Sequence, residues 1–275
     1  MPKIPLMQLR RIADVQRWLG NFGRQTLDFL ENAGGISIFF WRSVIAATST
    51  QLRWKATLEQ AYKIGVASLP LVMLTSLFTG MVLALQSSYQ LRLFSAEQFT
   101  SDLVALSITR ELGPVLTAMM VAGRVGAAMA AELGTMKVTE QVDALKALAT
   151  DPVRYLVVPR FLASMVMLVF LTIYSDLVGM VGGYVVGVFK LGLSSYSYFN
   201  RTVHALVLKD IYTGLFKSFI FALLIALVSC QEGLSVEGGA EGVGKATTQA
   251  VVLSIVLIIV VDCLATAVFY YAIPA

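Results

Sequence analysis

Charge is what this sequence has least of. Asp, Glu, Lys and Arg together make up 14% of its 275 residues, whereas hydrophobic residues make up 57%. Soluble domains carry about 25% charged residues, so a soluble core could not bury this much apolar surface. The composition excludes an ordinary soluble protein and predicts a polytopic membrane protein.

Cysteine and histidine are almost absent as well. The two cysteines, Cys230 and Cys263, lie in apolar stretches, and His204 is the single histidine. Without paired Cys/His spacing, neither a zinc site nor a disulfide framework is expected. No Ser/His/Asp or Cys/His arrangement stands out. We therefore expect a chain that has no catalytic residues, no metal and no cofactor of its own.

The first 63 residues are distinctly basic. They contain nine Lys or Arg residues against four acids, and their apolar residues recur at helical steps of three or four. A basic amphipathic helix containing Trp18 and Phe22 is typical of one that lies in the membrane interface, and GGISIFFWRSVIAA should continue that layer. An organelle transit peptide is the alternative interpretation. A secretory signal peptide fits poorly, because no compact apolar core follows the basic start.

The remaining residues, 64–275, are expected to form one transmembrane domain. Five stretches exceed or match the roughly 20 apolar residues that a spanning helix needs. We expect spans at about 64–91, 103–131, 161–189, 211–231 and 246–271. The predicted fold is an all-α integral membrane protein with an N-terminal interfacial helix.

The Lys and Arg residues outside the spans predict the orientation. With the N-terminus in the cytoplasm, the cytoplasmic segments hold fourteen of them and the opposite side holds four. Because cytoplasmic loops carry the excess of Lys and Arg, the N-terminus is expected inside and the C-terminus outside.

Six ionisable residues fall within the predicted spans, three of each sign. They are Arg110, Glu111, Arg124, Asp176, Lys217 and Asp262. Each costs about 2.5–3.5 kcal/mol on insertion scales, so such residues usually face a partner or a polar cavity. Two interpretations stay open for any one of them: a structural ion pair between helices, or a place in a polar cavity.

Pro114 closely follows the first two of these charges in the second span. Proline has no N–H and clashes with the carbonyl four residues earlier, here that of Arg110, so a kink and a free acceptor are expected there. On an ideal helix Arg124 would lie only about 40° round from Arg110. A stripe of small residues should let this span pack closely against another helix. The stripe consists of Ala118, Ala122, Gly126, Ala130 and Gly134.

The segment GAEGVGKA, residues 239–246, is similar to the phosphate-binding loop G-x-x-x-x-G-K-[ST]. Ala246 stands where that loop needs a hydroxyl, and the segment follows an apolar helix instead of a strand, so the confirming context is missing. We expect a flexible turn here, and therefore a separate subunit for any ATP-driven role.

Residues 110–160, RELGPVLTAMMVAGRVGAAMAAELGTMKVTEQVDALKALATDPVRYLVVPR, resemble the signature region of the MlaE permease family. These proteins are the membrane subunits of ABC transporters that work with MCE-domain lipid-binding proteins. The likeness extends through FTGMVLALQ, GLFKSFIFAL and VDCLATAVFYY in the first, fourth and fifth spans. It implies a homodimer with an outward-facing lipid cavity between protomers, and ATPase subunits that bind ATP and Mg²⁺.

The resemblance also assigns a coupling segment. Residues 132–151 match the family's cytoplasmic coupling helix, which docks on the ATPase. Val142, Leu145 and Ala149 give this segment a short apolar stripe, and Pro152 should stop the helix. The residues expected to serve coupling are Glu132, Gly134, Glu140, Asp143 and Lys146.

Further roles follow from the same resemblance. Arg110 and Glu111 match the family's charged pair near the dimer cavity, and Lys217 and Asp262 match charged positions on the last two spans. Tyr89 and Leu91 are expected at the outer mouth of the cavity. The expected intramembrane network comprises Arg110, Glu111, Arg124, Lys217 and Asp262.

The implied function is the permease subunit of an ATP-driven transporter that moves phospholipids between a bacterial inner membrane and an MCE-domain partner. The inner envelope of an organelle is the second choice of membrane. The alternative is a stand-alone ion-coupled transporter with Asp176, Glu111 and Asp262 as proton carriers. Such transporters often show two related halves, and no internal repeat is evident here. A membrane-embedded lipid enzyme is the third class, and the missing catalytic cluster argues against it.

Overall fold

The computed structural model describes residues 34–35, 38–46 and 53–272. Most of the expected interfacial region, residues 1–63, lies outside this part of the chain, and its last residues from Trp54 onward form the start of the first span. Within the described residues the secondary structure is helical, without strands, and five helices are long and apolar enough to cross a membrane. They are Trp54–Arg92, Glu97–Val138, Val153–Phe189, Leu208–Leu234 and Gly239–Tyr271. The predicted all-α class and the number of spans are confirmed.

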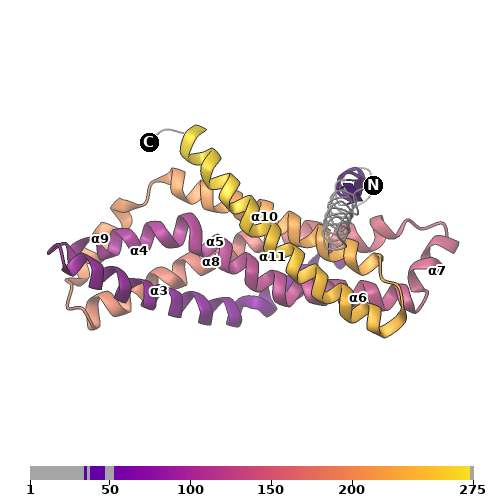
Figure 1. Ribbon diagram of the computed structural model, residues 1–275, viewed down its shortest axis with the longest axis horizontal. Helices are drawn as coiled ribbons and strands as arrows, with labels where there is room; N and C mark the ends of the chain where they lie inside the picture. Colours follow the sequence, from indigo (N-terminus) through magenta and orange to yellow (C-terminus); the bar gives the residue numbers. More distant parts are fainter. Residues whose placement is uncertain (1–33, 36–37, 47–52, 273–275) are drawn as a thin grey trace, which may run out of the picture.

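The five spans lie roughly along the long axis of the molecule, with α11 crossing the others diagonally (Figure 1). The first span joins α2 (Trp54–Ile64) through one 3₁₀ turn to α3 (Leu69–Arg92). The third is α8 (Val158–Phe189), the fourth α10 (Leu208–Leu234) and the fifth α11 (Gly239–Ala272).

The second span is interrupted by two π-helical turns, named η3 and η4. Its consecutive segments are α4 (Thr100–Ser107), η3 (Ile108–Leu112), α5 (Gly113–Val121), η4 (Ala122–Gly126) and α6 (Ala127–Val138). Such turns insert extra residues into an α-helix and are frequent at functional sites. The two intramembrane arginines of this span, Arg110 and Arg124, lie in η3 and η4.

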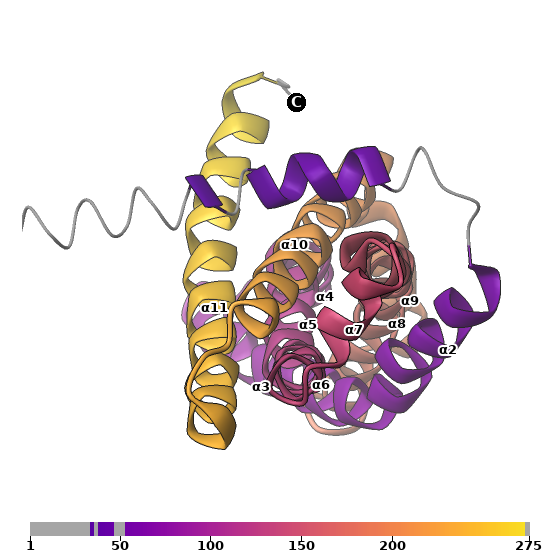
Figure 2. The same cartoon turned by 90° about the vertical axis from the view of Figure 1, so that its right-hand side faces the viewer.

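Two short helices mark opposite ends of the bundle, α7 (Gln141–Ala147) and α9 (Ser195–Ala205) (Figure 1). The helix of residues 38–46 lies across the bundle axis in the end view (Figure 2). Its Phe39 and Phe40 pack against Phe161 of α8 and Leu227 of α10.

Close backbone contact holds the spans together where the sequence places small residues. A Cβ on Gly80 of α3 would lie 1.9 Å from the carbonyl oxygen of Gly179 in α8, so only glycine fits there. The predicted stripe in the second span is buried, with Ala118, Ala122 and Ala130 all at 0% exposure. A Cβ on Gly233 of α10 would lie 2.8 Å from the carbonyl oxygen of Ala130. The stripe therefore packs against α10.

Two expectations about the connecting segments are wrong. The Gly-rich segment 239–246 is the first part of α11 and not a flexible turn. Lys245 pairs with Glu241 one turn earlier at 2.8 Å, and the chain reverses just before, where Gly238 has φ +85°. Residues 132–151 are also not one helix that Pro152 ends. Residues 132–138 continue α6, α7 ends at Ala147, and Pro152 precedes the next helical turn instead of ending α7.

Candidate functional site

The regular α-helical hydrogen bonding of the second span is interrupted at η3, next to Pro114. The N–H of Gly113 reaches back five residues to the carbonyl oxygen of Ile108, and proline at the next position has no N–H to donate. The carbonyl oxygen of Arg110 accepts a hydrogen bond from Nζ of Lys217 on α10 at 3.3 Å. A cation on a neighbouring helix therefore donates to the carbonyl oxygen whose usual α-helical donor position, four residues on, is taken by Pro114.

Lys217 is the centre of an interhelical charge cluster. Its side chain is only 2% exposed, and Nζ lies 2.6 Å from Oε2 of Glu111 and 2.9 Å from Oδ1 of Asp262. It also donates to Oγ1 of Thr266 at 2.7 Å. One ammonium thus faces two carboxylates from two other spans, which leaves one excess negative charge. Glu111 is 40% exposed, so that charge borders open space.

A second ion pair lies close by on the same spans. Nε of Arg110 donates to Oδ1 of Asp210 at 2.8 Å, and the Asp210 side chain is 5% exposed. Asp210 also accepts the N–H of Val207 at 3.3 Å, which caps the first turn of α10. Sequence reasoning missed Asp210 because it lies just before the predicted span. An acid in the first turn of a helix is, however, a recognisable helix-start signal.

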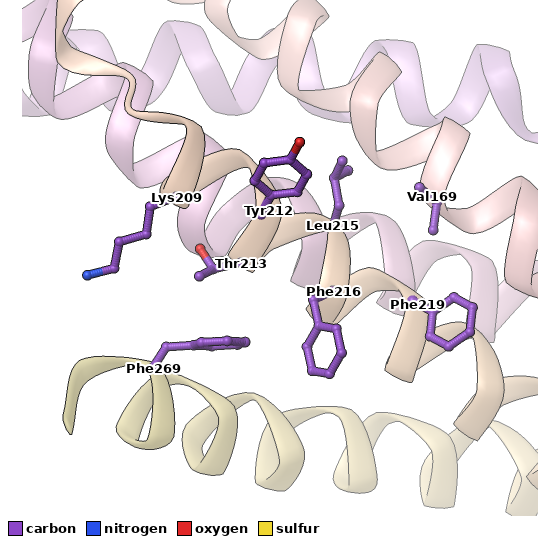
Figure 3. A pocket seen from close by; sticks show the side chains of 8 residues that line it. All are labelled: Val169, Lys209, Tyr212, Thr213, Leu215, Phe216, Phe219 and Phe269. Atoms are coloured by element: carbon purple, nitrogen blue, oxygen red, sulfur yellow. The ribbon is translucent and has the colours of Figure 1, made fainter. Parts of the chain in front are cut away.

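Two adjoining cavities border these charges. The polar one, about 280 Å³, is lined by Arg110, Glu111, Lys217 and Thr266. The apolar one, about 520 Å³, lies beside α10 and reaches Phe216 and Phe219 (Figure 3). Lys209, Thr213 and Phe269 line both.

The apolar cavity owes its shape to aromatic side chains from two helices. Phe216 points from α10 toward α11, and Phe269 of α11 lies in the same gap (Figure 3). Their rings meet edge to face with centroids 5.7 Å apart. Together the two cavities form one site that has a charged part next to an apolar part.

The structure brings together four of the seven residues predicted for this site, namely Arg110, Glu111, Lys217 and Asp262. Arg124 lies elsewhere, and its Nη1 donates to Oγ of Ser68 at 2.7 Å. Tyr89 and Leu91 lie near the end of α3 and line neither of the two cavities, and Tyr89 is 74% exposed.

Asp176 is buried on α8 next to the second span. A Cβ on Gly113 would lie 1.8 Å from its Oδ1, so Gly113 makes room for the carboxylate. No hydrogen bond among the described residues joins Oδ1 of Asp176 to Glu111 or Asp262. A proton path would require Asp176, Glu111 and Asp262 to be connected, and Oδ1 of Asp176 does not provide that connection.

The residues predicted for coupling lie in two different surroundings. Glu132, still in α6, binds Lys63 of α2 at 2.7 Å and Arg160 of α8 at 2.6 Å. Gly134 is buried, and a Cβ there would lie 2.8 Å from Val236. These two positions hold α6 in the bundle.

The other three predicted coupling residues, Glu140, Asp143 and Lys146, lie at or within α7. Nζ of Lys146 and Nζ of Lys137 reach Asp143 at 2.8 and 3.1 Å. The hydrogen bond from Lys146, followed by that from Lys137, lowers the pKa of the Asp143 carboxyl below its ordinary value.

The lowered pKa of Asp143 determines the pH range in which its ion pair with Lys137 connects α7 to α6. A group whose pKa falls on folding stabilises the fold above its unfolded pKa, and this contribution is lost as pH falls through the folded pKa. We therefore expect no change in α7 protection between pH 8 and pH 6. Asp143→Asn should accelerate amide hydrogen exchange across 141–147 at pH 7. Equal exchange rates in wild type and variant, after correction for intrinsic rates, would show that the ion pair between Lys137 and Asp143 does not hold α7.

Known proteins resemble this chain over most of its length. The family profile described as "Permease MlaE" matches residues 57–268. A "Probable ABC transporter permease protein" of Rickettsia felis is 45% identical over 248 residues, which cover 90% of this chain and 96% of the relative. The "Intermembrane phospholipid transport system permease protein MlaE" of Haemophilus influenzae is 34% identical over 259 residues, covering 94% and 99%.

A plant relative extends the comparison. The "Protein TRIGALACTOSYLDIACYLGLYCEROL 1, chloroplastic" of Arabidopsis thaliana is 37% identical over 235 residues, or 86% of this chain and 67% of that protein. The profile match includes the Lys217 cluster, both π-helical turns of the second span and α7. On this similarity and on its five apolar spans, the chain is a multi-pass membrane protein that belongs to the MlaE permease family.

Proposed function

We propose that this chain is the permease subunit of an ATP-driven transporter that moves phospholipids between the bacterial inner membrane and an MCE-domain lipid-binding partner. The observation that carries the proposal is the paired site at α10 and α11, where a cavity of about 280 Å³ with charged walls adjoins an apolar one of about 520 Å³. A phospholipid has the same division between headgroup and acyl chains. The Haemophilus relative is named for phospholipid transport, which supports this substrate class.

In this proposal the headgroup lies in the polar cavity. Arg110 is 52% exposed, and Asp210 engages its Nε. A guanidinium has five N–H donors in a fork that suits phosphate, so the remaining donors suit a headgroup phosphate. The acyl chains would lie among Phe216, Phe219 and Phe269. Lys217 and its carboxylates hold the three helices around this space.

The partners follow from the same proposal. Two copies of the chain form the working unit, and the exposed apolar face of α11 supports a contact with the second copy or with lipid. That face includes Val252, Val256, Ile259, Val260, Leu264 and Val268. Separate ATPase subunits bind ATP and Mg²⁺ and push on α7, which is directly followed by Leu148 with an exposure of 76%. The N-terminus lies in the cytoplasm and the C-terminus outside.

The test uses the full chain expressed with its ATPase and MCE partners and reconstituted in liposomes. Thr213→Trp places a large ring in the lining shared by both cavities, so we expect ATP-dependent phospholipid transfer to fall to the level of protein-free liposomes. Thr248→Trp is the matched control, because Thr213 and Thr248 both donate to a carbonyl oxygen of their own helix. Transfer in the control should match wild type.

Two outcomes would contradict the proposal. One is equal transfer by Thr213→Trp and Thr248→Trp. The other is a chain that purifies in mild detergent without an ATPase and whose transport follows the proton gradient. The second result would favour the ion-coupled alternative.

A further inference from the structure

A separate cavity of about 330 Å³ opens at the α7 end of the molecule, between α2 and the second span. Its polar lining consists of Gln60, Tyr62 and Lys63 from α2, and of Arg124 and Glu132 from η4 and α6. It shares no lining residue with the two cavities at α10 and α11. Nothing in the proposed transport path uses it.

Arg124 is the unexplained group in this cavity. Its Nη1 donates to Oγ of Ser68, and Ser68 is 1% exposed and donates its own proton to the carbonyl oxygen of Ile64 at 2.6 Å. Ser68 is thus a fixed acceptor that holds one edge of the guanidinium. Within the described residues Arg124 forms no ion pair. An arginine inside an apolar span costs about 2.5–3.5 kcal/mol, so an anion is expected to face it.

The charges around the cavity have an excess of one sign. Glu132 is shared between Lys63 and Arg160 at 2.7 and 2.6 Å. Arg160 is not part of the lining, so the cavity itself is lined by two cations, Arg124 and Lys63, and one carboxylate, Glu132, which is an excess of one positive charge. Basic pockets between membrane helices on the cytoplasmic side typically bind anionic lipid headgroups, and the Lys/Arg distribution predicts the α7 end to be cytoplasmic.

The outer face of α2 supplies the apolar surface that a lipid needs and a soluble anion does not. Trp54, Leu58 and Tyr62, four residues apart, are 67%, 66% and 63% exposed. Aromatic rings of this kind settle at the headgroup level of a bilayer. Tyr62 belongs both to this stripe and to the cavity lining, so the stripe leads directly to the cations.

We propose that this cavity binds the phosphate of an anionic phospholipid from the leaflet at the α7 end, with Arg124 and Lys63 on the phosphate and the acyl chains along α2. The bound lipid bridges α2 and the second span. It is a resident lipid of the permease, distinct from the transported one, so the site stands whether or not the chain transports phospholipid.

The experiment uses the full chain in detergent and a phosphatidylglycerol that carries a photoreactive headgroup. After illumination, cross-linked peptides are identified by mass spectrometry. We expect labels on α2 and on residues 124–132, in addition to any on α10 and α11. Arg124→Gln should lower the α2 labelling roughly tenfold, the loss expected when a charge-assisted hydrogen bond of about 1.5 kcal/mol or more is removed. Lys245→Gln, which removes an exposed cation elsewhere, should leave it unchanged.

A second variant distinguishes loss of lipid binding from misfolding of Arg124→Gln. Ala128→Trp fills the cavity and leaves both cations in place, and it should reduce labelling to the same degree. Unlabelled phosphatidylglycerol should compete, and millimolar inorganic phosphate should not.

Three results would overturn the proposal. Labelling confined to α10 and α11 would show that the cavity takes no lipid. Displacement by inorganic phosphate alone would assign the site to a soluble anion. A change of oligomeric state in Arg124→Gln, seen by size-exclusion chromatography, would show that the guanidinium pairs with a second copy of this chain.

Discussion

Replacing Lys217 with methionine should lower the free energy of unfolding by about 3–5 kcal/mol, because it leaves Glu111 and Asp262 as uncompensated charges in the bundle. The Lys217 side chain is 2% exposed, and it also holds Thr266 and the carbonyl oxygen of Arg110. No other described cation lies within ion-pair distance of these two carboxylates.

The chain's own thiols provide the measurement. Cys230 is buried and Cys263 is exposed, so in a Cys263→Ser background a maleimide dye reports unfolding through Cys230 alone. The unfolding midpoint of Lys217→Met should fall by roughly 6–20 °C, at about 2–4 °C per kcal/mol for a chain of this size. Lys245→Met, which breaks the exposed pair with Glu241, should change it little.

A third variant separates charge from packing. Lys217→Met combined with Glu111→Gln and Asp262→Asn removes all three charges, and replacing a whole buried ion network is often nearly neutral. We expect this triple variant to regain most of the lost stability. If Lys217→Met unfolds at the wild-type midpoint, the cluster does not hold the helices together.

Replacing Gly80 with alanine should destabilise the protein by about 1–3 kcal/mol, the usual cost of overpacking, and valine should cost more. A Cβ at this position would lie 1.9 Å from the carbonyl oxygen of Gly179 and 3.0 Å from its Cα. Those atoms are backbone, so relief requires α3 and α8 to separate.

Gly244→Ala is the matched control, because a Cβ there meets nothing within 4 Å. Alanine stabilises an exposed helix interior by roughly 0.5–1 kcal/mol relative to glycine, so this variant should unfold at or above the wild-type midpoint in the same Cys230 assay. Equal midpoints for Gly80→Ala and Gly244→Ala would show that α3 and α8 are not in the close contact described.

The sequence predicts the spans and the membership of the charge cluster better than the position of each charge along the second span. Glu111, Lys217 and Asp262 meet as expected, because apolar surroundings leave such charges no other partners. Arg124 does not join them. Fourteen residues of helix separate it from Arg110 by a rise of about 21 Å, and the π-helical turn η3 also changes the rotation of the residues that follow it.

The lining of the site was harder to predict. Phe216 and Phe269 look like ordinary lipid-facing residues, and only the crossing of α10 and α11 turns them toward a common space. The extent of the helices was also underestimated. Hydropathy marks the apolar centre of a span, but the polar continuation of α6 to Val138 and the start of α11 at Gly239 are held by tertiary contacts, such as those of Glu132.

The spacing of the two arginines in the second span bears on how the chain enters the bilayer during synthesis. Fourteen residues of helix rise only about 21 Å, less than the ~30 Å of hydrocarbon, so no vertical shift or tilt brings the Cα atoms of both arginines to the two headgroup layers at once. The carboxylate that pairs with Arg110 is Asp210, about a hundred residues later in the chain. The second span therefore gains its full stability in the membrane only after the fourth has been made, and its insertion is cooperative across nearly half of the polypeptide.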